Sequence, residues 1–136
     1  MDFSTSMAVA AAGLRAQSDR MKIIAENIAN ANSTSPATGG DPYRRQIATV
    51  KSEFDRTLNA TVVSAGNPIQ DQSPFRTQYD PGNPAADKQG YVKLPNVNSL
   101  VEIMDMREAQ RSYEADLTVM DSTKSMLART VDLLNK

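Results

Sequence analysis

Three carboxylates, Glu102, Asp105 and Glu108, recur every three residues near the start of the last third of the chain. This spacing places them on one side of a helix, where carboxylates could bind a cation or act as an acid and base pair. Charged rows on helices more commonly face solvent, opposite an apolar stripe. We therefore interpret the three residues as a solvated helix face and expect neither a metal site nor a catalytic group there.

Other side chains that support catalysis are scarce. The sequence has no histidine and no cysteine, which removes the commonest general base and every thiolate ligand or nucleophile. The segment Gly39-Gly40-Asp41 lacks the lysine and the following helix of a phosphate-binding loop. An enzyme built on carboxylates and lysines alone would need a concave pocket that the sequence pattern does not indicate. We expect no enzyme, no cofactor and no small-molecule substrate.

The charge balance excludes polyanionic partners. Fifteen Lys and Arg residues face 16 Asp and Glu residues, and Arg44-Arg45 beside Tyr43 is the one basic doublet in the sequence. Two charges are too few for a nucleic-acid site. No apolar run approaches the roughly 20 residues of a membrane span, and Met1-Asp2-Phe3-Ser4 is acidic where a signal peptide would be basic. We expect no membrane insertion and no cleaved secretory signal.

The first part of the sequence predicts a long helix. Residues 2–31 contain no proline and are rich in Ala, Met, Leu and Ile, with Asp2 as a plausible N-cap. The apolar residues step by four and three alternately, which is the spacing of a coiled-coil seam. The seam residues are Phe3, Met7, Ala10, Leu14, Met21, Ile24, Ile28 and Ala31, with Gln17 as the polar exception.

The last third predicts a second and longer helix. From Ser99 to about Asn135 there is no Gly or Pro, and Ser99 with Glu102 forms a capping-box pattern. Many charges exclude a membrane helix, and a periodic pattern of this length favours a coiled coil. The seam residues are Ile103, Met106, Gln110, Tyr113, Leu117, Met120, Lys124, Leu127, Val131 and Leu134.

The central residues 33–98 have a different composition and hold all seven prolines. Residues 45–54 and 61–64 have partial strand character, and residues 75–79 and 90–94 predict two short strands joined by a polar loop. The predicted fold is mainly α, a coiled-coil hairpin of two long terminal helices with a small β-rich insert. The predicted divisions are an N-terminal coiled-coil helix (1–32), a linker and β-rich insert (33–98) and a C-terminal coiled-coil helix (99–136).

The predicted helices suit assembly better than a self-sufficient fold. An isolated helical pair buries too little apolar surface to offset the backbone entropy of ordering it. Small residues on the first helix would let further helices approach: Ala8, Ala11, Ala12, Ala16, Ala25 and Ala29. Two interpretations follow from the pattern alone, a subunit of a larger assembly and a cytosolic coiled-coil adaptor or chaperone-like binding module. An adaptor should be folded when purified.

Several strings resemble the bacterial flagellar rod and hook proteins. The N-terminal strings are residues 12–17 (AGLRAQ) and 24–34 (IAENIANANST). The central and C-terminal strings resemble the proximal rod member and favour it over longer distal-rod and hook subunits; they are residues 42–46 (PYRRQ), 79–84 (YDPGNP), 90–92 (GYV), 94–98 (LPNVN), 111–115 (RSYEA) and 124–126 (KSM). Asp116 departs from the Asn that usually follows in this family, and residues 51–73 match only loosely.

The resemblance implies a structural subunit of the basal-body rod. Such a subunit is exported unfolded by the flagellar type III apparatus and polymerises in the periplasm into a hollow shaft that transmits torque. The implied partners are copies of the chain, other rod proteins, the adaptor between the MS ring and the rod, and the export apparatus. The seam residues would form the assembly surface. We expect the insert to make lateral contacts through Tyr43, Arg44, Tyr79, Tyr91 and Asn96.

Overall fold

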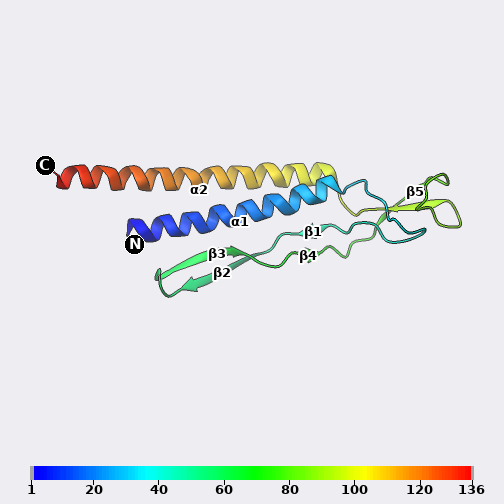
Figure 1. Ribbon diagram of the computed structural model, residues 1–136, viewed down its shortest axis with the longest axis horizontal. Helices are drawn as coiled ribbons and strands as arrows, with labels where there is room; N and C mark the ends of the chain where they lie inside the picture. Colours follow the sequence, from blue (N-terminus) through cyan, green and yellow to red (C-terminus); the bar gives the residue numbers. More distant parts are fainter. Residues whose placement is uncertain (1, 136) are drawn as a thin grey trace. The chain divides into compact units, whose positions relative to one another are not determined.

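The computed structural model describes residues 2–135, so the terminal positions 1 and 136 of the predicted divisions lie outside the described residues. It has a long helix near each end of the chain and short strands between them (Figure 1). In chain order the elements are α1 (Phe3–Ala29), β1 (Gln46–Ile47), β2 (Val50–Asp55), β3 (Ala60–Ala65), β4 (Ile69–Gln70), β5 (Arg76–Tyr79), β6 (Tyr91–Leu94) and α2 (Ser99–Leu134).

Both helices begin at a side-chain cap. The Thr5 amide donates to Asp2 Oδ1 at 2.7 Å, which confirms the predicted N-cap of α1. At the start of α2 the cap is Asn98, whose Oδ1 accepts from the Leu100 amide at 3.1 Å. The predicted capping box of Ser99 with Glu102 is therefore wrong, because Glu102 is engaged elsewhere. Within residues 2–135, no helix is both long enough and apolar enough to cross a membrane.

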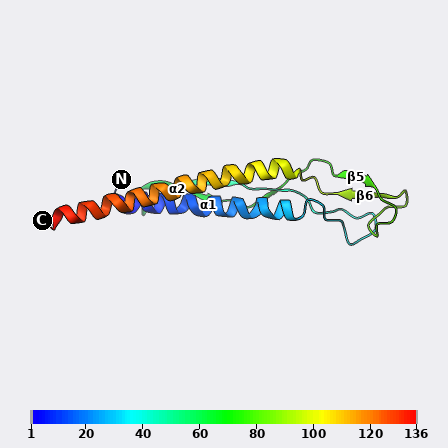
Figure 2. The same ribbon diagram turned by 90° about the horizontal axis from the view of Figure 1, so that it is seen from above.

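The chain divides into two compact units, and each combines helix with central segments. Unit 1 contains the chain up to Met21, residues 49–67 and the chain from Arg107. Its sheet is the antiparallel hairpin β2–β3, in which Val50 faces Ala65 and Asp55 faces Ala60. Its stretches of α1 and α2 run antiparallel and side by side (Figures 1 and 2), since Arg20 pairs with Glu108 and Gly13 lies against Asp116.

Unit 2 contains residues 22–48 and 68–106. Its two small antiparallel sheets are β1–β4 and β5–β6; in the second, Tyr79 faces Tyr91, which confirms the two strands predicted around residues 75–79 and 90–94. The core is small and aliphatic, with Ala85, Val92 and Val97 almost fully buried. Short side chains suffice because the backbone segments approach each other closely.

The predicted fold class, a mainly α coiled-coil hairpin, is wrong. The two helices and three separate two-stranded sheets form a mixed structure, in which the central segments are part of both units. The helical contacts also differ from a coiled-coil seam. In unit 1 the two helices meet where Gly13 lies against the Asp116 carboxylate and where Arg20 forms an exposed ion pair with Glu108. A coiled coil would have interlocking apolar side chains at these contacts.

The physical reason is the rotation of α2 about its axis. The buried positions of α2 are Glu102, Ala109 and Thr123, seven and fourteen residues apart, and half-buried Asp116 completes the same row. This row is displaced by one residue from the predicted row that contains Ile103 and Leu117. Small and polar side chains on the inner row permit close approach, whereas Ile103 and Leu117 are left 43% and 42% exposed.

A glycine fixes the loop between β5 and β6. Gly90 has φ of +86°, and a Cβ there would lie 2.9 Å from the Tyr79 ring. We expect Gly90→Ala to cost about 1–2 kcal/mol from the left-handed conformation alone. Urea unfolding followed by circular dichroism measures this cost. Gly82→Ala is the matched control, because its Cβ would meet its nearest atom only at 3.8 Å; equal losses for the two variants would contradict the prediction.

Candidate assembly surface

A buried polar cluster joins the helix ends to the strands within unit 2. We call Asn27, Tyr43, Arg45 and Glu102 the polar junction. Glu102 is fully buried and accepts hydrogen bonds from Asn27 Nδ2, at 3.0 Å, and from Arg45 Nε. Asn27 Oδ1 in turn accepts from the Tyr43 hydroxyl at 2.8 Å and from the Gln46 amide at 2.9 Å. Burial, together with the charges of Glu26 and Glu102, raises the pKa of Tyr43.

The polar junction corrects our interpretation of the three carboxylates as one solvated face. Glu102 is the most deeply buried of them, while Asp105 lies 3.7 Å from Arg45 and Glu108 pairs with Arg20 at the surface. Glu102 and Asp105 thus share Arg45, whereas Glu108 has a separate basic partner. Within the described part of the chain no three acidic side chains are grouped so as to hold a metal ion.

Sequence reasoning missed Glu102 as a structural anchor, although a signal was present. Asn27 lies on the inner face of α1, three residues after buried Ile24 and four before buried Ala31. A polar residue in such a stripe needs a hydrogen-bonding partner. Its amide donates both to Glu102 and to the Gln46 carbonyl.

Three of the five residues proposed for insert contacts make bonds inside unit 2. Tyr43 belongs to the polar junction. Arg44 stacks over the Phe75 ring at 4.2 Å and donates to the Asp71 and Ser73 carbonyls. Asn96 Oδ1 accepts from the Arg45 amide at 2.8 Å, and its Nδ2 donates to the same two carbonyls. These side chains position the segments of unit 2.

The other two proposed insert contacts are exposed. Tyr79 and Tyr91 face each other across β5 and β6 with ring centroids 5.3 Å apart and the planes at 65°. Tyr79 is 64% exposed and Tyr91 is 47% exposed. An edge-to-face aromatic pair loses little conformational freedom on contact, so this pair is suited to binding a neighbour.

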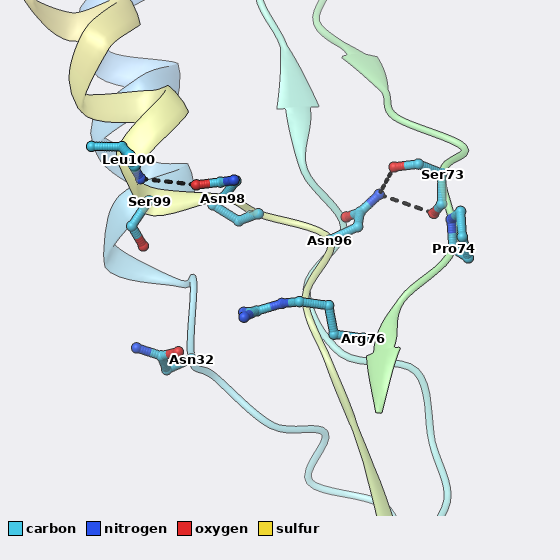
Figure 3. A pocket seen from close by; sticks show the side chains of 9 residues that line it. Asn32, Ser73, Pro74, Arg76, Asn96, Asn98, Ser99 and Leu100 are labelled. Atoms are coloured by element: carbon cyan, nitrogen blue, oxygen red, sulfur yellow. Dashed lines mark hydrogen bonds between the residues drawn. The ribbon is translucent and has the colours of Figure 1, made fainter. Parts of the chain in front are cut away.

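A pocket of about 440 Å³ lies in unit 2 beside the start of α2 (Figure 3). Asn32, Ser73, Asn96 and Ser99 contribute polar groups to its lining. Arg76 is the charged residue of the lining, and it donates to the Pro95 and Ala31 carbonyls at 3.2 and 3.1 Å. The lining supplies hydrogen-bonding groups but no carboxylate that could act as a general base.

The predicted seam residues differ in burial between the two helices. On α1, Ala10, Ile24 and the following Ala31 are buried, while the remaining apolar seam residues are half-buried. On α2, Met106, Tyr113 and Met120 are half-buried. The exposed residues of this seam are Ile103, Gln110, Leu117, Lys124, Leu127, Val131 and Leu134. The structure therefore leaves much of the apolar seam of α2 uncovered in a single chain.

Two carboxylates should make the stability of unit 2 depend on pH. Amide hydrogen bonds from Tyr91 and Gln89 lower the pKa of Asp87, and the amide of Ser73 lowers that of Asp71. Because the folded pKa lies below the unfolded value of about 3.9, this stability is present above about pH 4 and is lost as the pH falls. Asp87→Asn should flatten the fall in melting temperature below pH 4, and exposed Lys88→Gln should not; identical profiles would contradict this.

Comparison with known proteins gives the class of the chain. Residues 7–37 match the family described as Flagella basal body rod protein, and residues 88–133 match the Flagellar basal body rod FlgEFG protein C-terminal family. The flagellar basal-body rod protein FlgC of Agrobacterium fabrum is 49% identical over 96% of this chain and 94% of its own length. FlgC of Salmonella typhimurium is 37% identical over 92% of each, and FlgC of Bacillus subtilis is 36% identical over 94% and 95%.

These matches define a structural component of the flagellar basal-body rod, which confirms the family resemblance of the sequence strings. Sequence identity of 36–49% over nearly the full length of the chain distinguishes one family among the flagellar rod proteins. The chain belongs to the FlgC family of flagellar basal-body rod proteins. It is a structural rod subunit that assembles with other rod components in the basal body.

Proposed function

We propose that the chain builds the proximal part of the rod through α1 and α2, which pack with helices of neighbouring subunits into a hollow shaft that transmits torque. The observation that carries this proposal is the uncovered apolar seam of α2. Leu127, Val131 and Leu134 are 40%, 47% and 81% exposed. Apolar side chains in register over several turns favour contact with another helix.

The proposed partners are copies of the chain, the other rod proteins, the adaptor between the MS ring and the rod, and the flagellar type III export apparatus. The subunit reaches the periplasm as unfolded chain. A sequence with no cysteine suits this route, since no disulfide restricts passage through a narrow channel.

The exposed tyrosine pair of β5 and β6 makes the lateral contacts of the insert on the outside of the shaft. The two-stranded sheet β5–β6 gives the two tyrosine rings rigid support for these lateral contacts, whereas the helices provide the apolar seam for contacts between helices. Tyr43, Arg44 and Asn96 support these contacts from within unit 2 by holding its segments together.

Thiol labelling tests the helical assembly surface, because the sequence has no cysteine of its own. Leu127→Cys and the exposed Lys88→Cys should react equally with a maleimide in purified subunit. In isolated basal bodies Leu127→Cys should be protected at least about tenfold, whereas Lys88→Cys should still react. Equal labelling of both positions in intact rods would contradict assembly through α2.

A further inference from the structure

Unit 1 has a groove of about 440 Å³ between α1, β3 and α2. Val9 and Ala10 of α1, Val63 of β3 and Val119 of α2 give it aliphatic walls. Three polar side chains also line it, Ser6 and Gln17 of α1 and Asp116 of α2. The groove thus combines walls that suit a hydrocarbon stem with groups that suit a polar end.

The groove holds one buried hydrogen-bond acceptor without a donor, Gln17 Oε1, and one carboxylate outside any ion pair of the described residues, Asp116. Gln17 Oε1 is buried and has no hydrogen-bonding partner in the described structure. The Asp116 carboxylate lies against Gly13, where an added Cβ would be only 2.7 Å from Oδ2. No ion pair within residues 2–135 includes Asp116. A buried acceptor without a donor is unfavourable, so the groove is incomplete as a single chain forms it.

The side chain that fits this groove is an arginine. Its aliphatic stem packs against valine walls while its guanidinium donates several hydrogen bonds in one plane. A carboxylate and an amide oxygen can share such a donor, and the charge of Asp116 favours a cation over a neutral amide.

The chain carries suitable arginines on a different surface. Arg107 and Arg111 lie one turn apart on α2 and are exposed. Helical spacing places them on the side of α2 opposite Ala109 and Asp116, and therefore away from the groove of their own chain. No ion pair within the described residues includes either arginine.

We propose that the groove of one subunit receives Arg107 or Arg111 from α2 of a second copy of this chain. The inference rests on the proposed assembly through the terminal helices and adds a specific contact to it. Since the groove and the arginines are different patches, the contact is heterologous. Such contacts generate open helical arrays when the rotation does not close, which is the symmetry that a rod requires.

Cross-linking between two tagged copies tests the contact. One copy carries Gln17→Cys, the other carries Arg111→Cys or Arg107→Cys, and the unaltered chain is also expressed so that rods still form. A bismaleimide with a spacer about as long as an arginine side chain is applied to isolated basal bodies. We expect dimers that contain both tags with at least one of the arginine positions. The control pairs Gln17→Cys with the exposed Arg15→Cys of α1, which should give no mixed dimer above background.

The outcomes separate this contact from the proposed function. Rods that contain both tagged chains but give no mixed dimer at either arginine position would overturn the contact and leave assembly through the helices standing. If the cysteine variants are excluded from rods, a second experiment tests the contact. It counts rods in cells where Arg107 and Arg111 are both replaced by Lys and in cells where both are replaced by Gln. Rods near the normal number with Lys and a loss of tenfold or more with Gln support the contact. Equal counts would overturn it and indicate that water or another rod protein satisfies Gln17 and Asp116.

Discussion

Cells whose only copy of the chain carries Leu117→Asp are expected to export the subunit, to build no rod and not to swim. Leu117 is 42% exposed in the single chain, so the carboxylate remains hydrated there and the fold should tolerate it. In the proposed rod the same position is packed, and an unpaired buried charge costs about 3–5 kcal/mol for each subunit. Electron microscopy of basal bodies and a motility assay measure the effect.

Two comparisons make this result specific. The exposed Asp121→Asn lies off the seam on the same helix and should leave the cells motile. Circular dichroism of purified Leu117→Asp should match that of the unaltered chain. Rods of normal length in the Leu117→Asp strain would mean that the C-terminal seam is not an assembly surface.

Replacing Arg45 by methionine is expected to produce the largest loss of stability in unit 2. The substitution removes the cation that compensates Glu102, whose side chain is fully buried. Removing one partner of a buried ion pair lowers the free energy of unfolding by about 3–5 kcal/mol, because the other charge stays buried without compensation. Urea unfolding followed by circular dichroism should show a correspondingly lower midpoint.

A matched ion pair in the same unit provides the control. Lys93 and Asp41 are 2.8 Å apart, but their side chains are 44% and 65% exposed. Lys93→Met should therefore cost less than about 1 kcal/mol. Replacing Arg45 and Glu102 together by methionine should recover most of the loss, because no buried charge then remains. An equal effect of Arg45→Met and Lys93→Met would show that the polar junction is not a buried ion pair.

The helices and one strand pair could be predicted from sequence because their signals are local. Asp2 and the proline-free residues after it define the start and course of α1, and Tyr79 and Tyr91 lie in short runs bounded by turn residues. The family strings were equally direct, since they are contiguous in the sequence. None of these inferences depends on how distant segments meet.

The rotation of α2 about its axis and the polar junction could not be predicted in the same way. Apolar periodicity identifies a stripe on a helix but not which surface faces a given neighbour. The sequence therefore predicts Leu117 between the two helices and Glu102 on a solvated face. The structure reverses both, because Ala109 and Thr123 allow closer approach than a row of large side chains. The carboxylate of Glu102 is buried only because Asn27 and Arg45, distant in sequence, converge on it.

The unequal lengths of the two helices have a thermal consequence. α1 has 27 residues and α2 has 36, and in unit 1 the register of Gly13 with Asp116 leaves the turns that carry Val131 and Leu134 beyond the start of α1. Covering these side chains removes hydrated apolar area, which carries a negative heat-capacity change. The driving force for covering them therefore weakens on cooling, and subunits joined through this overhang are held more tightly in warm cells than in cold ones.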